Sequence, residues 1–256
     1  MKQVVDHLGR SVTYAFPPKR IISLCPAITE TLFHLSLQQE IVGRTKYCIF
    51  PEQQVAHVQT VGGTKQVDLA TIQSLQPDLI IMEKEENTKE MVDMLENHFP
   101  VYVFQVESIS EAQRMIEDAG QLVNRVEKSK ELVLQIDVAL KALPRKSGRA
   151  AYMMWRKPYM VVGATTYIND MLETVGFENP FTASEGRYPV VDIEALKNAQ
   201  LDYLFLSTEP FPFAQKHIEE LALHLPNTTI QIIDGEMFWY GAKMKEAAPY
   251  LKQFWQ

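Results

Sequence analysis

Two stretches that resemble each other decide the fold. VDLATIQSLQPDLIIM occupies residues 67–82 and VDIEALKNAQLDYLFL occupies residues 191–206, aligned without a gap at an offset of 124 positions. In each stretch an aspartate precedes apolar residues at helical spacing, and a run of large apolar residues typical of a buried strand follows. An offset close to half of the 256 residues indicates two similar lobes, because solenoid repeats recur every ~20–50 residues. Chance similarity between two helix–strand units is the alternative.

Strands and helices alternate around both stretches. Residues 4–14 read as a short hairpin, and Asp68 and Thr29 are expected to cap helices. Short apolar runs predict strands at 21–24, 41–43, 79–82, 101–104, 151–154 and 232–234. The alternation predicts an α/β fold with parallel sheets and helices on their faces.

Residues 110–143 interrupt the alternation because they favour helix throughout. Gly120 is expected to break this helix, and Pro144 to end it. A surface helix is one interpretation, but a helix that joins two lobes fits better because the alternation resumes afterwards. We therefore expect an N-terminal lobe at 1–122, a connecting helix at 123–147 and a C-terminal lobe at 148–256.

The composition excludes several classes of protein. The 25 basic and 32 acidic residues give a net charge of −7, which argues against nucleic acid as a partner. No run of about 18 apolar residues predicts a membrane span. The opening residues lack the apolar region of a secretory signal, so either a signal was removed or the protein is cytoplasmic.

An ordered set of short motifs carries a resemblance to a known family. The set comprises RIISLCPAITE (20–30), Val42-Gly43, Tyr47-Cys48, Pro51, Val61-Gly62-Gly63, the Asp68 helix with Pro77–Ile80, Gly163, Asp170, Leu172, Gly176, Tyr188-Pro189 and Asp234–Phe238. From about residue 4 onward, the chain resembles the substrate-binding proteins of ABC importers for vitamin B12, haem and ferric siderophores. Within these proteins, the chain resembles the helical-backbone metal receptor type, and it looks closest to the B12-binding branch.

The resemblance implies a specific architecture and function. It implies two Rossmann-like lobes joined by one long backbone helix, with a metal chelate bound in the cleft between them. The chelate, a corrinoid or a ferric siderophore, carries cobalt or iron, and the protein has no intrinsic cofactor. The implied setting is a monomer that serves an ABC permease in the periplasm or at the membrane surface. A cytoplasmic chelate-binding or sensing homologue is the alternative.

Candidate ligand residues follow the predicted strands, because ligands of such sheets bind beyond the carboxyl ends of the strands. The candidates are Cys25, Pro26, Tyr47, Thr64, Lys65, Lys84, Trp155, Tyr188, Glu236, Phe238 and Trp239. Aromatic residues of the B12-binding relatives stand near Tyr47, Trp155, Tyr188 and Phe238. Thr64 and Glu83 depart from those relatives, which have tryptophan there. For each aromatic residue core packing is the alternative, and for each lysine a solvated surface charge.

The sequence offers no bare metal site and no enzyme motif. The six histidines are scattered, so any metal is expected to arrive inside its chelate, although Tyr47 as an axial iron ligand stays open. Cys25 and Cys48 either approach disulfide distance or are two buried thiols, and we favour thiols. No G-x-S-x-G, G-x-G-x-x-G, Walker or H-E-x-x-H motif occurs, so the protein is not expected to be an enzyme.

The resemblance also implies two docking residues. Family members present one acidic residue per lobe, at the start of the repeated helices, to arginines of the permease. Glu194 matches this position in the second lobe. The first lobe has Ala70 there, with Asp68 and Glu90 as the nearest substitutes, and this departure favours the cytoplasmic alternative.

Overall fold

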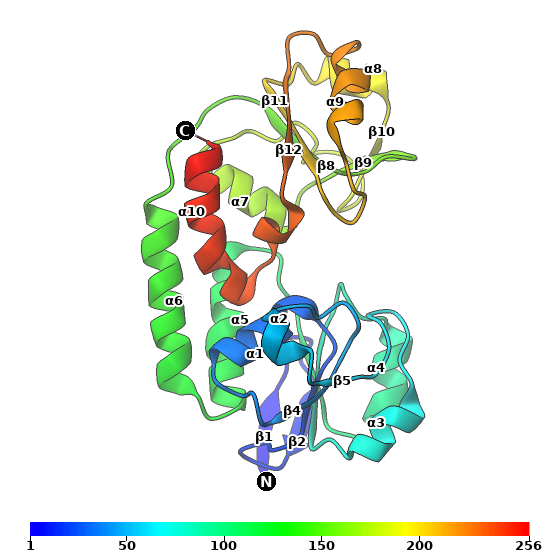
Figure 1. Cartoon of the computed structure of the whole chain (residues 1–256), viewed down its shortest axis with the longest axis vertical. Coiled ribbons are helices and arrows are strands. Elements are labelled where there is room, and N and C mark those ends of the chain that lie inside the picture. The colour runs from blue at the N-terminus through cyan, green and yellow to red at the C-terminus, as the bar shows by residue number, and fades with distance from the viewer. Residues whose placement is uncertain (256) are drawn as a thin grey trace. The chain divides into compact units, whose positions relative to one another are not determined.

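The computed structural model describes residues 1–255, which form two compact units with one large sheet each (Figure 1). Unit 1 comprises residues 1–106 and 111–137, and unit 2 comprises 107–110 and the chain from residue 138 onward. The second boundary falls inside helix α6 (Val126–Lys141), within the segment expected to connect the lobes. Within the described residues, no helix is both long and apolar enough to span a bilayer.

Unit 1 contains a five-stranded parallel sheet in the order β5-β4-β3-β6-β7. Its strands are β3 (Ile21–Ser23), β4 (Ile41–Arg44), β5 (Gln59–Thr60), β6 (Leu79–Glu83) and β7 (Val101–Phe104). Its helices before residue 107 are α1 (Pro26–His34), α2 (Glu52–Val55), α3 (Leu69–Leu75) and α4 (Lys89–Glu96). Because β3 and β6 are central and buried, they read as continuous apolar runs rather than as alternating patterns.

The N-terminal hairpin covers one edge of this sheet. Strands β1 (Lys2–Val5) and β2 (Ser11–Tyr14) pair antiparallel, which confirms the predicted hairpin. The Asp6 carboxylate accepts the N–H of Val103 at 3.2 Å, and His7 donates its N–H to the Val103 carbonyl at 3.2 Å. These bonds occupy part of the β7 edge, which would otherwise be open to strand pairing.

One predicted helix cap is confirmed and the other is wrong. The Asp68 carboxylate accepts the N–H groups of Ala70 and Thr71 at the start of α3. Thr29 lies inside α1, where its hydroxyl donates to the Cys25 carbonyl at 2.9 Å. Pro26 starts α1 four residues earlier than a cap at Thr29 implies, because its fixed φ suits the first helical position.

Gly120 does not break the long helical segment as predicted. Helix α5 (Ile109–Leu122) runs through it, and the chain turns at Asn124, which has a φ of 58°. A Cβ on Gly120 would lie 2.1 Å from Oγ of Ser129 in α6. The glycine therefore lets two helices approach closely. Helix propensity ranks glycine low in either role, so the sequence did not distinguish a glycine at a helix contact from one that ends a helix.

Unit 2 contains a mixed five-stranded sheet in the order β10-β9-β8-β11-β12. The strands are β8 (Ala150–Trp155), β9 (Tyr159–Val161), β10 (Val190–Val191), β11 (Tyr203–Ser207) and β12 (Thr229–Ile233). The helices are α7 (Tyr167–Val175), α8 (Ile193–Asn198), α9 (Gln215–Ala222) and α10 (Met244–Phe254), with 3-10 turns η1 (Gly235–Phe238) and η2 (Gly241–Lys243). Strands β8, β11 and β12 are parallel as expected, but β9 and β10 are not parallel to their neighbours. The turn at 156–158 is too short for a parallel crossover, so β9 must run antiparallel to β8.

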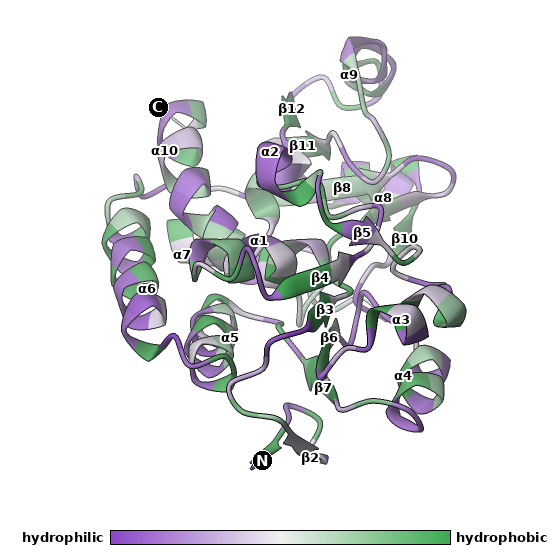
Figure 2. Cartoon of the chain, turned by 60° about the horizontal axis from the view of Figure 1, so that its bottom comes forward, coloured by the Kyte–Doolittle hydropathy of each residue, from purple (hydrophilic) through white to green (hydrophobic). Residues whose placement is uncertain are grey.

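Each unit has its own apolar core. The core of unit 1 packs β3, β6 and β7 against α3 and α4, whose apolar sides appear green in Figure 2. The core of unit 2 packs β8, β9 and β11 against α8 and α9. The two similar stretches of sequence thus form α3–β6 in unit 1 and α8–β11 in unit 2, with Asp68 and Asp192 as matching caps.

Candidate functional site

Four loops of unit 1 follow parallel strands and therefore meet at one end of its sheet. We call these loops (24–26, 45–48, 62–66 and 84–87) the strand-end surface of unit 1. They carry the predicted residues Cys25, Pro26, Tyr47, Thr64, Lys65 and Lys84. The topology thus brings together candidates that are far apart in sequence, as expected for a parallel sheet.

Tyr47 is the most exposed aromatic residue of this surface, with 51% of its area accessible. A Cβ on Gly63 would lie 3.2 Å from Cε2 of Tyr47, so the ring packs directly on the Gly63 backbone. Nζ of Lys46 lies 5.0 Å from the centre of the ring, within cation–π range. The ring is therefore supported on one side while it remains accessible.

The other candidates of unit 1 differ in accessibility. Lys65 and Lys84 are exposed and tethered, since Nζ of Lys65 donates to the Glu85 carbonyl at 2.6 Å and Nζ of Lys84 to the Gln105 side chain at 3.1 Å. Pro26 is half-buried, whereas Cys25 and Thr64 are buried beneath the surface. Cys25 and Cys48 are both buried thiols and form no disulfide, which confirms the favoured interpretation for the described chain.

Sequence reasoning missed Asn87, and it noted Glu83 only as a departure from relatives. Asn87 is 5% exposed, and its side chain bonds to Glu83 N–H and to the carbonyls of Leu24 and Thr64. Glu83 is 2% exposed, and burial raises the pKa of its carboxyl to about 7. The position of Asn87 just before a helix suggests a simple cap, so the sequence held no signal for its long-range bonds.

In unit 2 we define the strand-end surface as Trp155 at the end of β8 together with the segments after β8, β11 and β12 (residues 156–158, 208–213 and 234–240). Trp155 is 39% exposed, its indole N–H donates to the Lys157 carbonyl at 3.2 Å, and its ring meets Phe211 edge-on at 5.9 Å. Trp239 is half-buried and donates its indole N–H to the Glu209 carboxylate, which joins the loops after β12 and β11.

The remaining candidates of unit 2 lie elsewhere or deeper. Phe238 is 4% exposed and packs on the Tyr152 ring at 4.8 Å, so it supports the surface from within the core. Glu236 is half-buried. Burial, and to a lesser extent the negative charge of the nearby Asp234, raises the pKa of its carboxyl. Tyr188 is half-buried and precedes β10, at the end of β9 away from the turn that follows Trp155. Its place in a ligand site stays a prediction.

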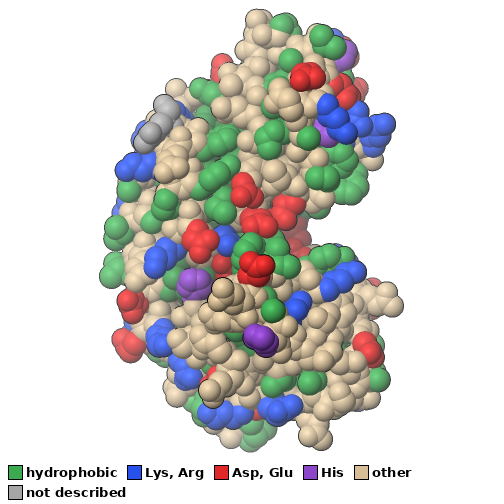
Figure 3. All heavy atoms as spheres, viewed as in Figure 1, with side chains coloured by type: hydrophobic (Ala, Val, Ile, Leu, Met, Phe, Trp, Pro, Cys, Tyr) green, Lys and Arg blue, Asp and Glu red, His purple; other side chains and the backbone are tan. Residues whose placement is uncertain are grey.

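Arg156 on this surface and Arg187 beside Tyr188 are already paired. Arg156 Nη2 lies 2.6 Å from the Glu220 carboxylate, which also accepts the Tyr159 hydroxyl at 3.1 Å. Arg187 Nη1 lies 2.7 Å from the Glu107 carboxylate. Both guanidinium groups are thus partly neutralised by carboxylates. On the visible face of the described residues, Figure 3 likewise shows acidic and basic side chains interspersed.

Two candidate docking acids are exposed at helix starts. Glu194 lies in the first turn of α8, and its carboxylate pairs with Lys197 of the same helix at 2.8 Å. Asp68 is occupied as the cap of α3 and also accepts the Thr71 hydroxyl at 2.5 Å. Hydrogen bonding to Thr71 lowers the pKa of Asp68, so its carboxylate is already committed to the helix.

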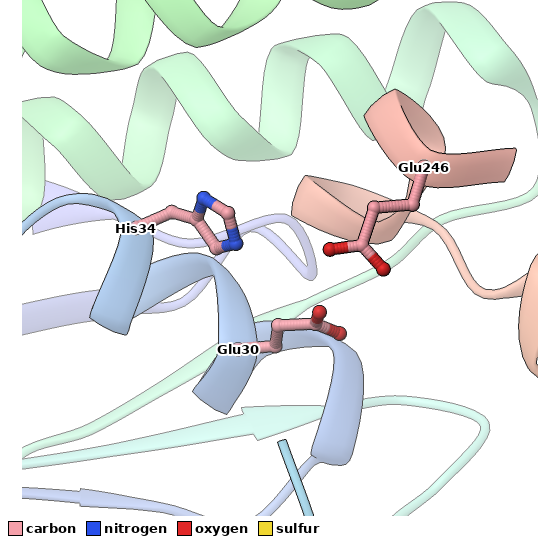
Figure 4. Close-up of side chains that lie close together, drawn as sticks. All are labelled: Glu30, His34 and Glu246. Atoms are coloured by element: carbon pink, nitrogen blue, oxygen red, sulfur yellow. The ribbon is translucent and has the colours of Figure 1, made fainter. Parts of the chain in front are cut away.

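Glu30 and His34 stand on successive turns of α1 in unit 1 (Figure 4). The third labelled residue, Glu246, belongs to α10 of unit 2. Protein metal sites for zinc use three or four protein ligands, and α1 by itself supplies two. We therefore assign no metal site to this helix.

Comparison with known proteins defines the family. The profile of the family described as periplasmic binding protein matches residues 21–225. A vitamin B12-binding protein of Vibrio campbellii is 26% identical over 197 residues, which are 75% of this chain and 71% of that protein. An uncharacterised ABC transporter substrate-binding lipoprotein of Bacillus subtilis is 25% identical over 206 residues, covering 75% of this chain and 65% of that protein.

Solved structures share the fold. A possible iron-binding, periplasmic solute-binding protein from Staphylococcus epidermidis superposes with a TM-score of 0.79 at 22% identity, covering 93% of this chain and 98% of that one. The periplasmic vitamin B12-binding protein of Vibrio cholerae superposes with a TM-score of 0.74 at 20% identity, covering 94% and 97%. The profile match spans most of the sequence and both structural units. The chain therefore belongs to the periplasmic binding protein family.

Proposed function

We propose that this protein is the substrate-binding component of an ABC-type importer and binds a metal chelate, a corrinoid or a ferric siderophore. The observation that carries the proposal is an accessible aromatic ring on the strand-end surface of each unit, Tyr47 in unit 1 and Trp155 in unit 2. Flat macrocycles and aryl chelates bind well to such rings, because the apolar faces stack while polar edges find hydrogen bonds.

The family relationship supports this class of ligand. The names of relatives and fold neighbours mention vitamin B12, haem and ferric hydroxamate. These ligands share an organic chelate that encloses the metal, so the protein needs to recognise the organic shell rather than coordinate a bare ion. The proposed role is binding without catalysis and with no resident cofactor, in the periplasm or at the membrane surface.

A second candidate is a chelate-binding or sensing protein that docks to no permease. The specific observation in its favour is Ala70, which stands where the resemblance implies a docking acid. The nearby Asp68 is a poor substitute because its carboxylate caps α3. Glu90 in the first turn of α4 is the remaining acid, and it is exposed.

A thermal-shift screen tests the proposed function. The purified chain is heated with cyanocobalamin, cobinamide, haemin and several ferric siderophores, each over a concentration series. A ligand at about 100 times its Kd should raise the free energy of unfolding by ~2.7 kcal/mol, since it binds only the folded protein. If none of these chelates shifts the unfolding temperature at millimolar concentration, the chelate-binding proposal is wrong.

A further inference from the structure

One buried side chain connects three of the four loops of the strand-end surface of unit 1. Asn87 accepts the N–H of Glu83 at 2.9 Å through Oδ1. Its Nδ2 donates to the Leu24 carbonyl at 3.0 Å and to the Thr64 carbonyl at 2.9 Å. Leu24 directly precedes Cys25, and Thr64 directly precedes Lys65. The Asn87 side chain thus bonds to the backbone at all three of these loops, which carry candidate ligand residues.

Glu83 completes this arrangement within the loop at 84–87. Its Oε2 accepts the N–H of Glu85 at 2.7 Å and the N–H of Glu86 at 2.9 Å, so the carboxylate closes the loop back onto the end of β6. The Asn87 N–H donates to the Glu83 carbonyl at 2.9 Å. The loop is therefore fixed from within by Glu83 and tied outward by Asn87.

The outward bonds distinguish this arrangement from an ordinary helix cap. A cap bonds to the backbone of its own helix, and Thr88 already does so at the start of α4. The two Nδ2 bonds of Asn87 instead reach residues 63 and 23 positions away in sequence. A buried amide with all of these bonds is costly to disturb, because each lost partner leaves a desolvated polar group.

We propose that Asn87 and Glu83 are positioning residues that hold the three loops in one arrangement and thereby set the ligand affinity of unit 1. Neither needs to touch the ligand. The effect on ligand affinity rests on the proposed function, whereas the connection between the loops does not. The connection and the affinity are therefore measured in separate experiments.

Hydrogen exchange of the ligand-free protein tests the connection. Asn87→Ala should speed amide exchange by roughly tenfold or more in the loops at 24–26, 62–66 and 84–87, which corresponds to ~1.4 kcal/mol of lost local stability. Asn97→Ala is the matched control, since Asn97 is exposed and donates only a local bond to Asp93 at the end of α4. Faster exchange confined to the loop at 84–87 would overturn the proposal, because the long-range bonds would then contribute nothing.

Two further variants separate the roles of the pair. Asn87→Asp keeps the acceptor for Glu83 but loses both donors, so exchange should rise at 24–26 and 62–66. Glu83→Ala should speed exchange within 84–87, and Glu83→Gln should restore it, because the amide oxygen still accepts the two N–H groups. If the Asn87 variants fail to fold, NMR of the unaltered protein decides: the Nδ2 protons of Asn87 should exchange slowly, and fast exchange would contradict the proposal.

Ligand binding tests the second part. With whichever of cyanocobalamin, haemin or ferrichrome binds the unaltered protein, Asn87→Asp should raise the Kd by roughly tenfold, and Glu83→Gln should leave it near the original value. An unchanged Kd in a variant whose loops exchange faster would overturn the effect on affinity. If no probe binds the unaltered protein, the proposed function fails, while the exchange data still decide whether Asn87 connects the loops.

Discussion

Tyr47 shows how a single residue becomes available for binding. Its ring packs against the backbone of Gly63 and lies under Lys46, yet about half of its surface stays accessible. An aromatic ring held in this way loses little conformational entropy when a ligand stacks on it. Trp155 is held similarly, by its bond to the Lys157 carbonyl and by contact with Phe211.

We predict that Tyr47→Ala and Trp155→Ala each weaken chelate binding by ~1–3 kcal/mol, because the stacking area is lost. The unfolding temperature without ligand should fall only modestly, since Tyr47 is 51% and Trp155 39% exposed. Isothermal titration with the best ligand from the thermal screen measures the effect. Phe16→Ala is the matched control, because Phe16 is a similarly exposed aromatic residue outside the strand-end surface. Equal affinity of all three variants would contradict the role of the two rings.

Glu83 makes the stability of unit 1 depend on pH. Burial raises the pKa of its carboxyl from 4.5 to about 7, so the folded state favours the neutral form. Between these values the folded protein holds a proton that the unfolded chain has released, and stability therefore falls as pH rises from 4.5 to about 7. Above this range the contribution stays lost, and below it the contribution is fully present.

We predict that the unaltered protein loses on the order of 3 kcal/mol relative to Glu83→Gln over this pH range. Urea unfolding of both proteins at several pH values gives the difference, in which the other titrating groups cancel. Glu117→Gln, which alters an exposed carboxylate of α5, should run parallel to the unaltered protein. A constant difference between the unaltered protein and Glu83→Gln would show that Glu83 does not titrate in this range.

At the scale of helices and strands, the contact between α5 and α6 depends on the absence of one side chain. A Cβ at Gly120 would lie 2.1 Å from Oγ and 2.5 Å from Cβ of Ser129. Ser129 is buried, and its hydroxyl donates to the Val126 carbonyl at 2.9 Å, so the side chain cannot simply swing away. The helices would have to separate to accept an alanine.

We predict that Gly120→Ala destabilises the protein, with an overpacking cost of ~1–3 kcal/mol. In an isolated helix the same change would stabilise by ~1 kcal/mol, so the sign distinguishes helix packing from helix propensity. Urea unfolding measures the change in the free energy of unfolding, and Glu117→Ala on the exposed face of α5 is the control. Adding Ser129→Gly should recover part of the loss. A more stable Gly120→Ala protein would mean that the helices do not pack this closely.

Elements with strong local signals were predictable, and those that depend on contacts were not. The Asp68 and Asp192 caps, the central strands and the hairpin follow from side-chain chemistry within a few residues. The antiparallel strands β9 and β10 did not follow, because Tyr159–Val161 carries no mark of strand direction. The short turn at 156–158 sets the direction of β9, and the direction of β10 depends on which edge of the sheet the chain reaches after α7.

At the scale of the whole molecule, the proposed importer role requires an exposed surface for a permease. Glu194 meets this requirement, since its side chain is exposed and pairs with Lys197 on the same helix. Such a surface ion pair costs little to exchange for an arginine of another protein. In unit 1 the Asp68 carboxylate caps α3, whereas Glu90 in the first turn of α4 is exposed.

We predict that Glu194→Ala weakens docking by about tenfold, or ~1.4 kcal/mol, while ligand affinity stays unchanged. Uptake by the permease in reconstituted vesicles measures docking, and titration measures affinity. Glu219→Ala, an exposed acid of α9, is the control. If Glu194→Ala leaves uptake as unaffected as the control does, this surface does not dock. That result would favour the alternative of a chelate-binding or sensing protein that docks to no permease.

The sequence by itself determined the two α/β units, the repeated helix–strand pair and the strand ends at which candidate residues stand. These features depend on local periodicity and on capping chemistry, which each segment carries within itself. Only the tertiary structure decided that Phe238 packs in the core while Tyr47 stays exposed, and that Gly120 serves a helix contact. It alone revealed that Asn87 connects loops far apart in sequence. Exposure and long-range hydrogen bonds depend on which segments meet in space, and a one-dimensional pattern does not contain that information.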